Sequence, residues 1–273
     1  MKSSRKKRRA MLLAISMFSI IPVRSQWEES SARLVPRFFP LVGLLLGVLW
    51  WGVAELLRLV PPPPALAAAL LLAVPVIFTG MIHLDGFLDC CDAVFSHRDQ
   101  EGMRRILKDP ACGPFAVVSA CMLFLLLWTS FYELWQGLGI PWAVWVLEPV
   151  AARALTAWAL QTIRPISETG FAAAFHTGRQ LDQLMALTVF LLTGVLLSAL
   201  VGTSGAGAFV CASAAFLLGL WLCRKLLGGI SGDVCGFCLT LFDAGFFVVY
   251  SWLWQGKKGE IGYDPLFGWG ISG

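Results

Sequence analysis

The chain has 273 residues, of which 58% are hydrophobic and only 14% are charged, and its formal net charge is +4. A typical soluble domain is about a quarter charged, so this composition excludes an ordinary soluble protein and predicts a membrane protein. The basic residues gather at the ends of apolar runs and form no patch interleaved with aromatic residues, which excludes nucleic-acid binding and indicates a topology signal.

The N-terminus begins with a basic cluster, residues 2–9 (KSSRKKRR), which is followed by the apolar sequence MLLAISMFSIIPV. This order is typical of a signal peptide, but no small-residue cleavage site follows it. We therefore expect an uncleaved segment that associates with the membrane or re-enters it. The basic cluster should remain on the cytoplasmic side, because Lys and Arg are enriched there.

Continuous apolar runs follow, each close to or above the ~20 residues that cross a bilayer as a helix. A bilayer requires backbone groups to be paired internally, so continuous runs of this kind predict helices. We expect seven spans, at about 38–59, 65–82, 112–135, 141–163, 184–203, 206–227 and 234–254. The sequence thus predicts an all-α polytopic membrane bundle, a single membrane-embedded domain over residues 1–273. Residues 83–109 are expected to form a polar loop and an amphipathic helix at the cytoplasmic face.

The distribution of Lys and Arg predicts the orientation of these spans. With the N-terminus inside, the cytoplasmic segments all contain basic residues, and they are 1–37, 83–111, 164–183 and 224–233. The outer connections contain none, and they are 60–64, 136–140 and 204–205. Lys257 and Lys258 in the tail fall outside and break the rule. We expect a multi-pass protein of the bacterial cytoplasmic membrane whose site faces the cytoplasm.

Three aspartates, Asp85, Asp89 and Asp92, follow directly on an apolar run. Their spacing of i, i+4 and i+7 places all three on one face of an α-helix, where like charges repel each other. A bound cation would remove this repulsion, and Mg²⁺ is usually held by one or two carboxylates together with substrate phosphates. The spacing therefore predicts a Mg²⁺ site, with a solvated acidic helix end at the membrane surface as the alternative.

A second acidic element is the sequence GGISGD at 228–233. Glycines let the backbone approach a ligand, and consecutive N–H groups at such a turn can bind phosphate. Gly229 and Gly232 are therefore predicted to contact substrate, although a plain interhelical turn fits the sequence equally well. Asp243 lies about ten positions into the last span, where an ionisable residue is costly unless it is paired or lines a cavity, so it is predicted to be functional.

Basic side chains near these acids complete the candidate site. Arg153 lies within a span, where a guanidinium requires a carboxylate or a phosphate; Glu148 is the alternative partner. Lys108 is predicted to hold phosphate or to anchor its helix at the interface, and Arg98 is a further predicted substrate contact. His83 is a candidate general base or a donor behind the metal ligands. Together these residues predict Mg²⁺-assisted phosphate chemistry on a membrane-associated substrate.

The sequence HLDGFLDCCDA at 83–93, followed by Arg98-Asp99 and by ILKDPACGPFAV at 106–117, resembles the cobalamin synthase family, the adenosylcobinamide-GDP ribazoletransferases. Further matches occur in the same order, and they are FFPLVGLLLG at 38–47, Ala152-Arg153 and GGISGD at 228–233. The resemblance covers nearly the whole chain. It departs from the family at Leu239 and Thr240, where an Asn-Glu pair is usual.

The resemblance implies an integral membrane enzyme that requires Mg²⁺. Its implied reaction joins adenosylcobinamide-GDP to α-ribazole or its 5′-phosphate and releases GMP. Asp85, Asp89 and Asp92 are the implied metal ligands, and Asp233 and Asp243, which match acidic positions of the C-terminal motif, are given the same role. His83 or Asp92 is then the base for the attacking hydroxyl. The expected partners are these substrates and the lipid bilayer, with a homo-oligomer left open.

Two other functions remain open. A CDP-alcohol phosphotransferase-like enzyme of phospholipid synthesis also holds metals on an acidic helix face, but Cys91 and Ala93 interrupt its usual sequence. A divalent-cation transporter would place acids near the midplane of several spans, whereas here only Asp243 lies deep.

Overall fold

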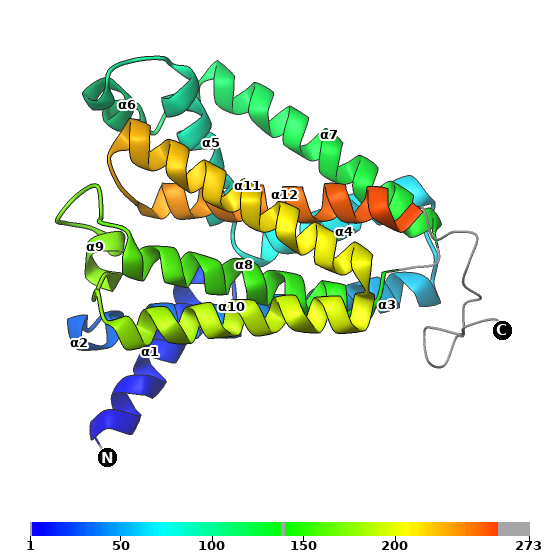
Figure 1. The fold of residues 1–273 in the computed structure, drawn as a ribbon, viewed down its shortest axis with the longest axis horizontal. Coiled ribbons are helices and arrows are strands. Elements are labelled where there is room, and N and C mark those ends of the chain that lie inside the picture. Colours follow the sequence, from blue (N-terminus) through cyan, green and yellow to red (C-terminus); the bar gives the residue numbers. More distant parts are fainter. Residues whose placement is uncertain (1, 138–139, 256–273) are drawn as a thin grey trace.

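The computed structural model describes residues 2–137 and 140–255, which are largely helical (Figure 1). The chain begins with the helix α1 (Lys2–Phe18) and two four-residue elements, α2 (Glu29–Ala32) and the 3-10 helix η1 (Val35–Phe38). The helices that follow are α3 (Phe39–Leu59), α4 (Pro64–Phe78), α5 (Ile82–Phe95), α6 (Gln100–Ile106), α7 (Pro114–Gln136), α8 (Trp142–Thr162), α9 (Phe171–Phe175), α10 (Gln180–Val201), α11 (Thr203–Leu227) and α12 (Gly232–Gln255). In these residues the β pairing is confined to one isolated bridge, between Pro165 and Ile230.

Six helices are long and apolar enough to cross a membrane, and they are Val35–Leu59, which joins η1 to α3, together with α7, α8, α10, α11 and α12. The helices α4 and α5 meet the same criterion only as a pair, and they are bent by 91° relative to each other. Counted as one interrupted span, the pair brings the crossings of the described chain to seven. The expectation of an all-α membrane bundle with about seven spans is confirmed.

The predicted span at 65–82 is wrong in its last turn, because α4 already ends at Phe78. Pro75 lies inside this helix and supplies no backbone N–H. Gly80 and Met81 then adopt φ angles of 60° and 67°. Left-handed angles cannot continue a right-handed helix, so the chain turns sharply before α5 begins.

The segment 83–109, predicted as a polar loop and an amphipathic helix, contains two helices, α5 and α6, joined by a short connection. The carboxylates of α5 occupy one face, while Phe87 and Cys90 are buried on another. α5 packs against α7 and α12, so it belongs to the bundle. The shorter helix α6 follows, and Asp99 caps its start by accepting the Gly102 N–H at 3.1 Å.

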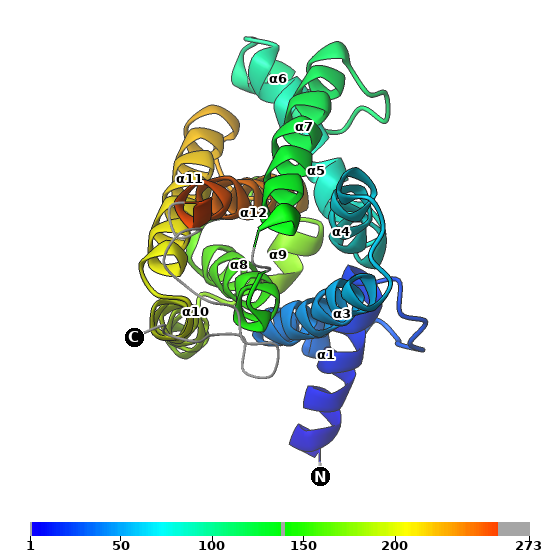
Figure 2. The same ribbon diagram turned by 90° about the vertical axis from the view of Figure 1, so that its right-hand side faces the viewer.

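The helix α8 lies at the centre of the bundle, in contact with α3, α10 and α12 (Figure 2). Gly43 and Gly47 of α3 face it: a Cβ at Gly43 would lie 2.4 Å from the Pro149 carbonyl oxygen, and one at Gly47 would lie 2.7 Å from the Val146 Cα. Pairs of small residues at this spacing let membrane helices approach closely. The contact holds α8, and with it Arg153, firmly against α3.

The connections of the bundle lie at two opposite ends. In Figure 1, α1, α2, α6 and α9 share one end with the connections that precede α7, α10 and α12, whereas the connections after α3 and α10 lie at the other. The segments predicted to be cytoplasmic are therefore together at one end. Lys257 and Lys258, which broke the charge rule, lie outside the described residues.

The N-terminal segment forms the helix α1, which packs against η1 and α3. Its apolar half is buried at Ala10, Leu13 and Ala14. At its basic half, Arg9 forms an ion pair with Glu28. The Ser30 hydroxyl and the Arg9 guanidinium hold the pKa of Glu28 below its ordinary value, so this pair stays charged at neutral pH.

Candidate active site

The helices α5 and α12 meet in close contact at two glycines. A Cβ added at Gly86 would lie 2.7 Å from the carbonyl oxygen of Asp233, and one at Gly236 would lie 2.9 Å from the carbonyl oxygen of His83. The Thr240 hydroxyl donates to that same His83 carbonyl at 3.4 Å. Small residues in both helices therefore hold the two acidic elements of the sequence side by side.

Three carboxylates gather where these helices meet. The charges of Asp85 and Asp233 both act on Asp89, and the charge of Asp85 also acts on Asp233. Asp85 is exposed, and the other two are half-buried. The Ser231 hydroxyl donates to Asp233 at 3.2 Å and accepts the Val234 N–H at 3.2 Å, which fixes Asp233 at the start of α12. The structure thus brings three of the five predicted metal ligands near one another from two distant parts of the chain.

The donor set determines which metal these carboxylates suit. Across residues 2–137 and 140–255, no three His, Cys, Asp or Glu side chains are close enough to enclose a metal ion by themselves. Mg²⁺ does not need such a cage, because it keeps several waters and is usually held by one or two carboxylates and substrate phosphates. One or two of Asp85, Asp89 and Asp233 could serve as such ligands together with substrate and water, so Mg²⁺ at this site stays a prediction.

Asp92, the third aspartate of the α5 series, lies in a different environment. It is buried, and its two oxygens accept backbone N–H groups from Gly113 at 2.5 Å and from Ala116 at 2.9 Å. Both donors belong to the N-terminus of α7, where unpaired N–H groups carry partial positive charge. Asp92 thus ties α5 to the start of α7. Its roles as metal ligand and base stay predictions.

A cavity of about 420 Å³ opens beside the carboxylates, in the size range of small-molecule sites. Its polar wall comes from α5, α8 and α12 and includes His83, Asp85, Arg153, Thr156 and Asp233. The opposite wall is apolar and comes mainly from α1, α3 and α9. The cavity therefore offers one polar and one apolar surface to a single ligand.

Arg153 enters this cavity from α8 and is only 3% exposed. Its Nη1 donates to the Pro149 carbonyl oxygen at 3.4 Å, while Nε and Nη2 have no partner in the part of the chain that the structure describes. None of the ion pairs there includes Arg153, so the alternative of a pair with Glu148 does not form. Buried donors without acceptors are costly, so Nε and Nη2 could bind an anion, although the carboxyl groups of Glu148 and Asp243 already act on the charge of Arg153.

Asp243 lies deeper in α12 than the other predicted ligands. Ten residues separate it from Asp233, about 15 Å along a helix, so it does not join the carboxylates at the α5–α12 contact. It lines a second, smaller cavity with His83 and Arg153, and its carboxyl group interacts directly with that of Glu148. Burial and the nearby like charge make it costly for both carboxyl groups to be charged at once.

Of the remaining predicted substrate contacts, one lines the 420 Å³ cavity and three do not. Gly232 lines the 420 Å³ cavity, and nothing lies within 4 Å of its Cβ position, so the backbone there is open to a ligand. Gly229 packs instead against the Arg164 carbonyl oxygen, 2.5 Å from its Cβ position. Arg98 and Lys108 are exposed on either side of α6 and do not line this cavity. Substrate contact by these last three residues stays a prediction.

The sequence did not identify the apolar wall or the role of Arg104. Phe18, Phe39 and Phe175 come from three elements, with ring centroids 4.6 Å apart for the first pair and 6.4 Å for Phe39 and Phe175. Each phenylalanine stands in an ordinary apolar sequence, so no sequence signal connects them.

Arg104 of α6 donates from Nε to the Leu227 carbonyl oxygen at 2.8 Å, and this hydrogen bond pairs one of the free carbonyl groups at the end of α11.

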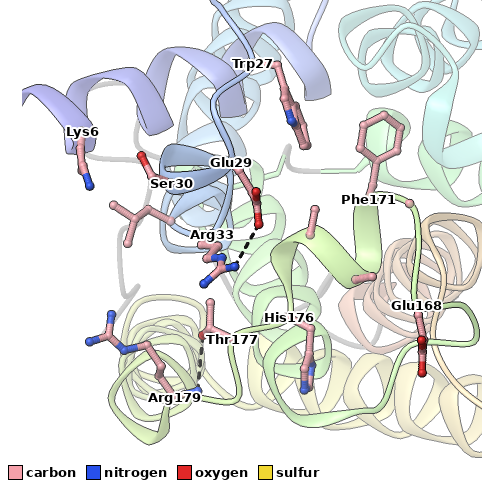
Figure 3. A pocket seen from close by; sticks show the side chains of 14 residues that line it. Lys6, Trp27, Glu29, Ser30, Arg33, Glu168, Phe171, His176, Thr177 and Arg179 are labelled. Carbon is pink, nitrogen blue, oxygen red and sulfur yellow. Dashed lines mark hydrogen bonds and ion pairs between the residues drawn. The ribbon is translucent and has the colours of Figure 1, made fainter.

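A wider cavity of about 980 Å³ lies at the same end of the bundle (Figure 3). Its lining includes the basic residues Lys6 and Arg179 and also His176. Trp27 and Phe171 border one side, with ring centroids 5.8 Å apart. Phe171 also lines the 420 Å³ cavity, so the two cavities adjoin.

The fold and these cavities define a multi-pass membrane protein with two partly polar cavities at one end of its helices. A family model described as cobalamin-5-phosphate synthase matches residues 10–251, so the chain belongs to that family. This confirms the family expected from the aspartate sequence.

Curated relatives are similar over most of their length. The adenosylcobinamide-GDP ribazoletransferase of Clostridium botulinum (strain Alaska E43 / Type E3) is 33% identical over 235 residues, which are 85% of this chain and 93% of the relative. The protein of the same name from Geobacillus kaustophilus (strain HTA426) is 35% identical over 251 residues, 89% of this chain and 94% of the relative. No solved structure matches the chain.

Proposed function

We propose that this chain is an adenosylcobinamide-GDP ribazoletransferase, which joins adenosylcobinamide-GDP to α-ribazole or its 5′-phosphate and releases GMP. The observation that carries the proposal is Arg153, whose unpartnered nitrogens lie in a cavity bordered by Asp85 and Asp233. A phosphate fits both features, because its oxygens bind an arginine and also a cation held by carboxylates. The names of the similar proteins support the same activity.

In the proposed reaction, a hydroxyl oxygen of α-ribazole forms a bond to the phosphorus on the cobinamide side of the pyrophosphate. The bond from that phosphorus to the bridging oxygen breaks, and its electron pair leaves with GMP. Arg153 binds the phosphate oxygens, and the hydroxyl proton passes to a base. His83 and Asp92 are the candidate bases: His83 lines the cavity, although burial and the positive charge of Arg153 make it harder to protonate, and both oxygens of Asp92 already accept N–H groups of α7.

Asp85, Asp89 and Asp233 are the proposed Mg²⁺ ligands. When bound, the ion neutralises charge on the pyrophosphate and on the leaving GMP. The negative charges of Asp85 and Asp233 make a charged Asp89 costly, and a bound cation would offset this repulsion. We expect Mg²⁺ and the nucleotide substrate to bind together.

The two adjoining cavities suggest how the substrates enter. The corrin ring of adenosylcobinamide-GDP is too large for the 420 Å³ cavity, so we assign this substrate to the wider cavity of Figure 3. The proposed location is the cytoplasmic membrane of a bacterium, with this end inside. The basic residues of α1 and α6 support that orientation, because Lys and Arg are enriched in cytoplasmic segments.

Turnover of the purified protein tests the proposal. Protein in detergent is incubated with adenosylcobinamide-GDP, α-ribazole and Mg²⁺, and the products are followed by mass spectrometry. We expect GMP and a corrinoid product in equal amounts, and neither in the presence of EDTA. Folded protein that leaves intact substrates unchanged would overturn the proposal. Reaction with CDP-activated lipid alcohols instead would assign the chain to phospholipid synthesis.

A further inference from the structure

The apolar wall of the 420 Å³ cavity is a connected group of aromatic rings. Phe18 and Phe39 meet edge to face, with an interplanar angle of 68°, and Phe39 and Phe175 do so at 85°. Phe171 continues the wall and stacks on Phe175, with ring centroids 6.2 Å apart. Aromatic side chains arranged in this way favour a further flat ring as their neighbour.

The volume of the cavity limits what can occupy it. About 420 Å³ lies toward the small end of the range for small-molecule sites. This space holds a nucleoside, but it does not hold a corrin ring with its side chains. In the proposed reaction, on which this inference rests, the groups of suitable size are α-ribazole and the guanosine of the nucleotide substrate.

The chemistry of the wall separates these two groups. Val42, Leu160 and Leu239 join the phenylalanines around the apolar part of the cavity, and all three are buried. Guanine carries several hydrogen-bond donors and acceptors, and burying them without partners is costly. The benzimidazole base of α-ribazole is a fused aromatic ring without a hydrogen-bond donor, so it loses little in this environment.

We propose that the base of α-ribazole binds against Phe18, Phe39 and Phe175, with its ribose toward Thr156 and His83. The polar and apolar walls then match the two halves of one nucleoside. This position brings the ribose hydroxyls to the same wall as Arg153, where the phosphate binds. The aromatic wall therefore selects the incoming nucleoside and sets the direction of its hydroxyl groups.

Substitution of the rings tests this assignment. Phe39→Leu and Phe175→Leu keep an apolar side chain but remove the aromatic face, and losing one base–aromatic contact weakens binding about tenfold. We expect KM for α-ribazole to rise about tenfold, with KM for adenosylcobinamide-GDP unchanged. A rise in the second KM instead would place guanine in the cavity, and no change in either would overturn the site.

A matched control uses another aromatic pair. Phe190 of α10 is buried and stacks on Phe209 of α11 at 4.7 Å, and neither residue lines the cavity. Phe190→Leu should therefore leave both KM values unchanged. Phe171→Ala is an independent test, because Phe171 is 58% exposed and its substitution should not disturb the folding of the core. Phe171→Ala should also raise KM for α-ribazole.

Direct binding separates this inference from the proposed reaction. Calorimetric titration of wild-type protein with α-ribazole alone, and with the α-riboside of adenine, measures affinity without turnover. We expect α-ribazole to bind at least tenfold more tightly than the adenine riboside, and Phe39→Leu to remove most of the difference. Equal binding of the two ribosides would overturn the inference even if the wild-type enzyme is active. An inactive wild type that still shows this preference would overturn the reaction and not the site.

Discussion

A Cβ at Gly86 would lie 2.7 Å from the Cα of Asp233, closer than such atoms approach in proteins. The glycine on α5 is therefore what allows the start of α12 to lie against it. Because Gly86 directly follows Asp85, the same contact sets the separation between the carboxylates of the two helices.

The first prediction concerns Gly86→Ala. The added methyl group has to push α5 away from α12, so we expect turnover to fall at least tenfold. The matched control is Gly52→Ala on α3, where nothing lies within 4 Å of the Cβ position. Ala favours a helix over Gly by about 0.8–1 kcal/mol, so this variant should keep its activity and unfold at the same or a higher temperature. Wild-type turnover in Gly86→Ala would show that the contact does not matter.

The second prediction concerns the Mg²⁺ requirement. Asp89→Asn removes one charged oxygen donor from the proposed metal site, so we expect half-maximal activity to need at least tenfold more Mg²⁺. Titration of turnover with Mg²⁺ after treatment with EDTA measures this. Glu101→Gln on the exposed face of α6 is the control for loss of one acidic charge, and its titration should match the wild type. Identical curves for all three proteins would remove Asp89 from the metal site.

The third prediction concerns Asp92, whose two oxygens accept the Gly113 and Ala116 N–H groups. Asp92→Asn leaves one amide oxygen for two donors and removes the charge that faces the α7 N-terminus. We expect the free energy of unfolding to decrease by about 1–3 kcal/mol, with the Mg²⁺ titration unchanged. The reverse result, a shifted titration without loss of stability, would support the metal-ligand role predicted from the sequence.

The fourth prediction concerns Arg153. Arg153→Lys keeps a positive charge near Glu148 and Asp243 but loses the planar fork that grips phosphate. We expect kcat/KM for adenosylcobinamide-GDP to fall about 10- to 100-fold, with a smaller change in thermal stability. Arg224→Lys, an exposed arginine in the last turn of α11, should leave both values unchanged. Similar kinetics for the two variants would show that Arg153 does not bind phosphate.

The fifth prediction concerns orientation. Cys112 is an exposed free cysteine in the connection before α7, at the same end as the carboxylates. A membrane-impermeant maleimide should label it only after the cells are permeabilised. Pro61→Cys, at the opposite end, should be labelled in intact cells, with Cys112→Ser as the background. The opposite pattern would place the site outside.

The sequence predicted the long helices well, because each is a continuous apolar run that a bilayer can accept in only one form. It placed the end of the second span wrongly, because hydrophobicity continues through Met81 although the backbone does not. Helical spacing predicted Asp85, Asp89 and Asp92 as one group, whereas the metal-ligand role of Asp233 was implied only by the family resemblance. The deeper position of Asp243 beside Glu148 depends on how α8 and α12 pack. Likewise, the ring cluster of Phe18, Phe39 and Phe175 exists only after three separate helices are in place.

The sharp bend between α4 and α5 also has a consequence for the surrounding lipid. α4 has 15 residues, about 22 Å of helix, and the 91° bend turns α5, the other half of this interrupted span, away from its direction, so the stretch along α4 is short of the roughly 30 Å hydrocarbon layer. A hydrophobic stretch that is too short is accommodated when the bilayer becomes thinner around it. The membrane next to α4 should therefore be thinner than elsewhere around the bundle. Reconstituted in vesicles, the protein is expected to work best with short acyl chains and to lose activity as the chains lengthen.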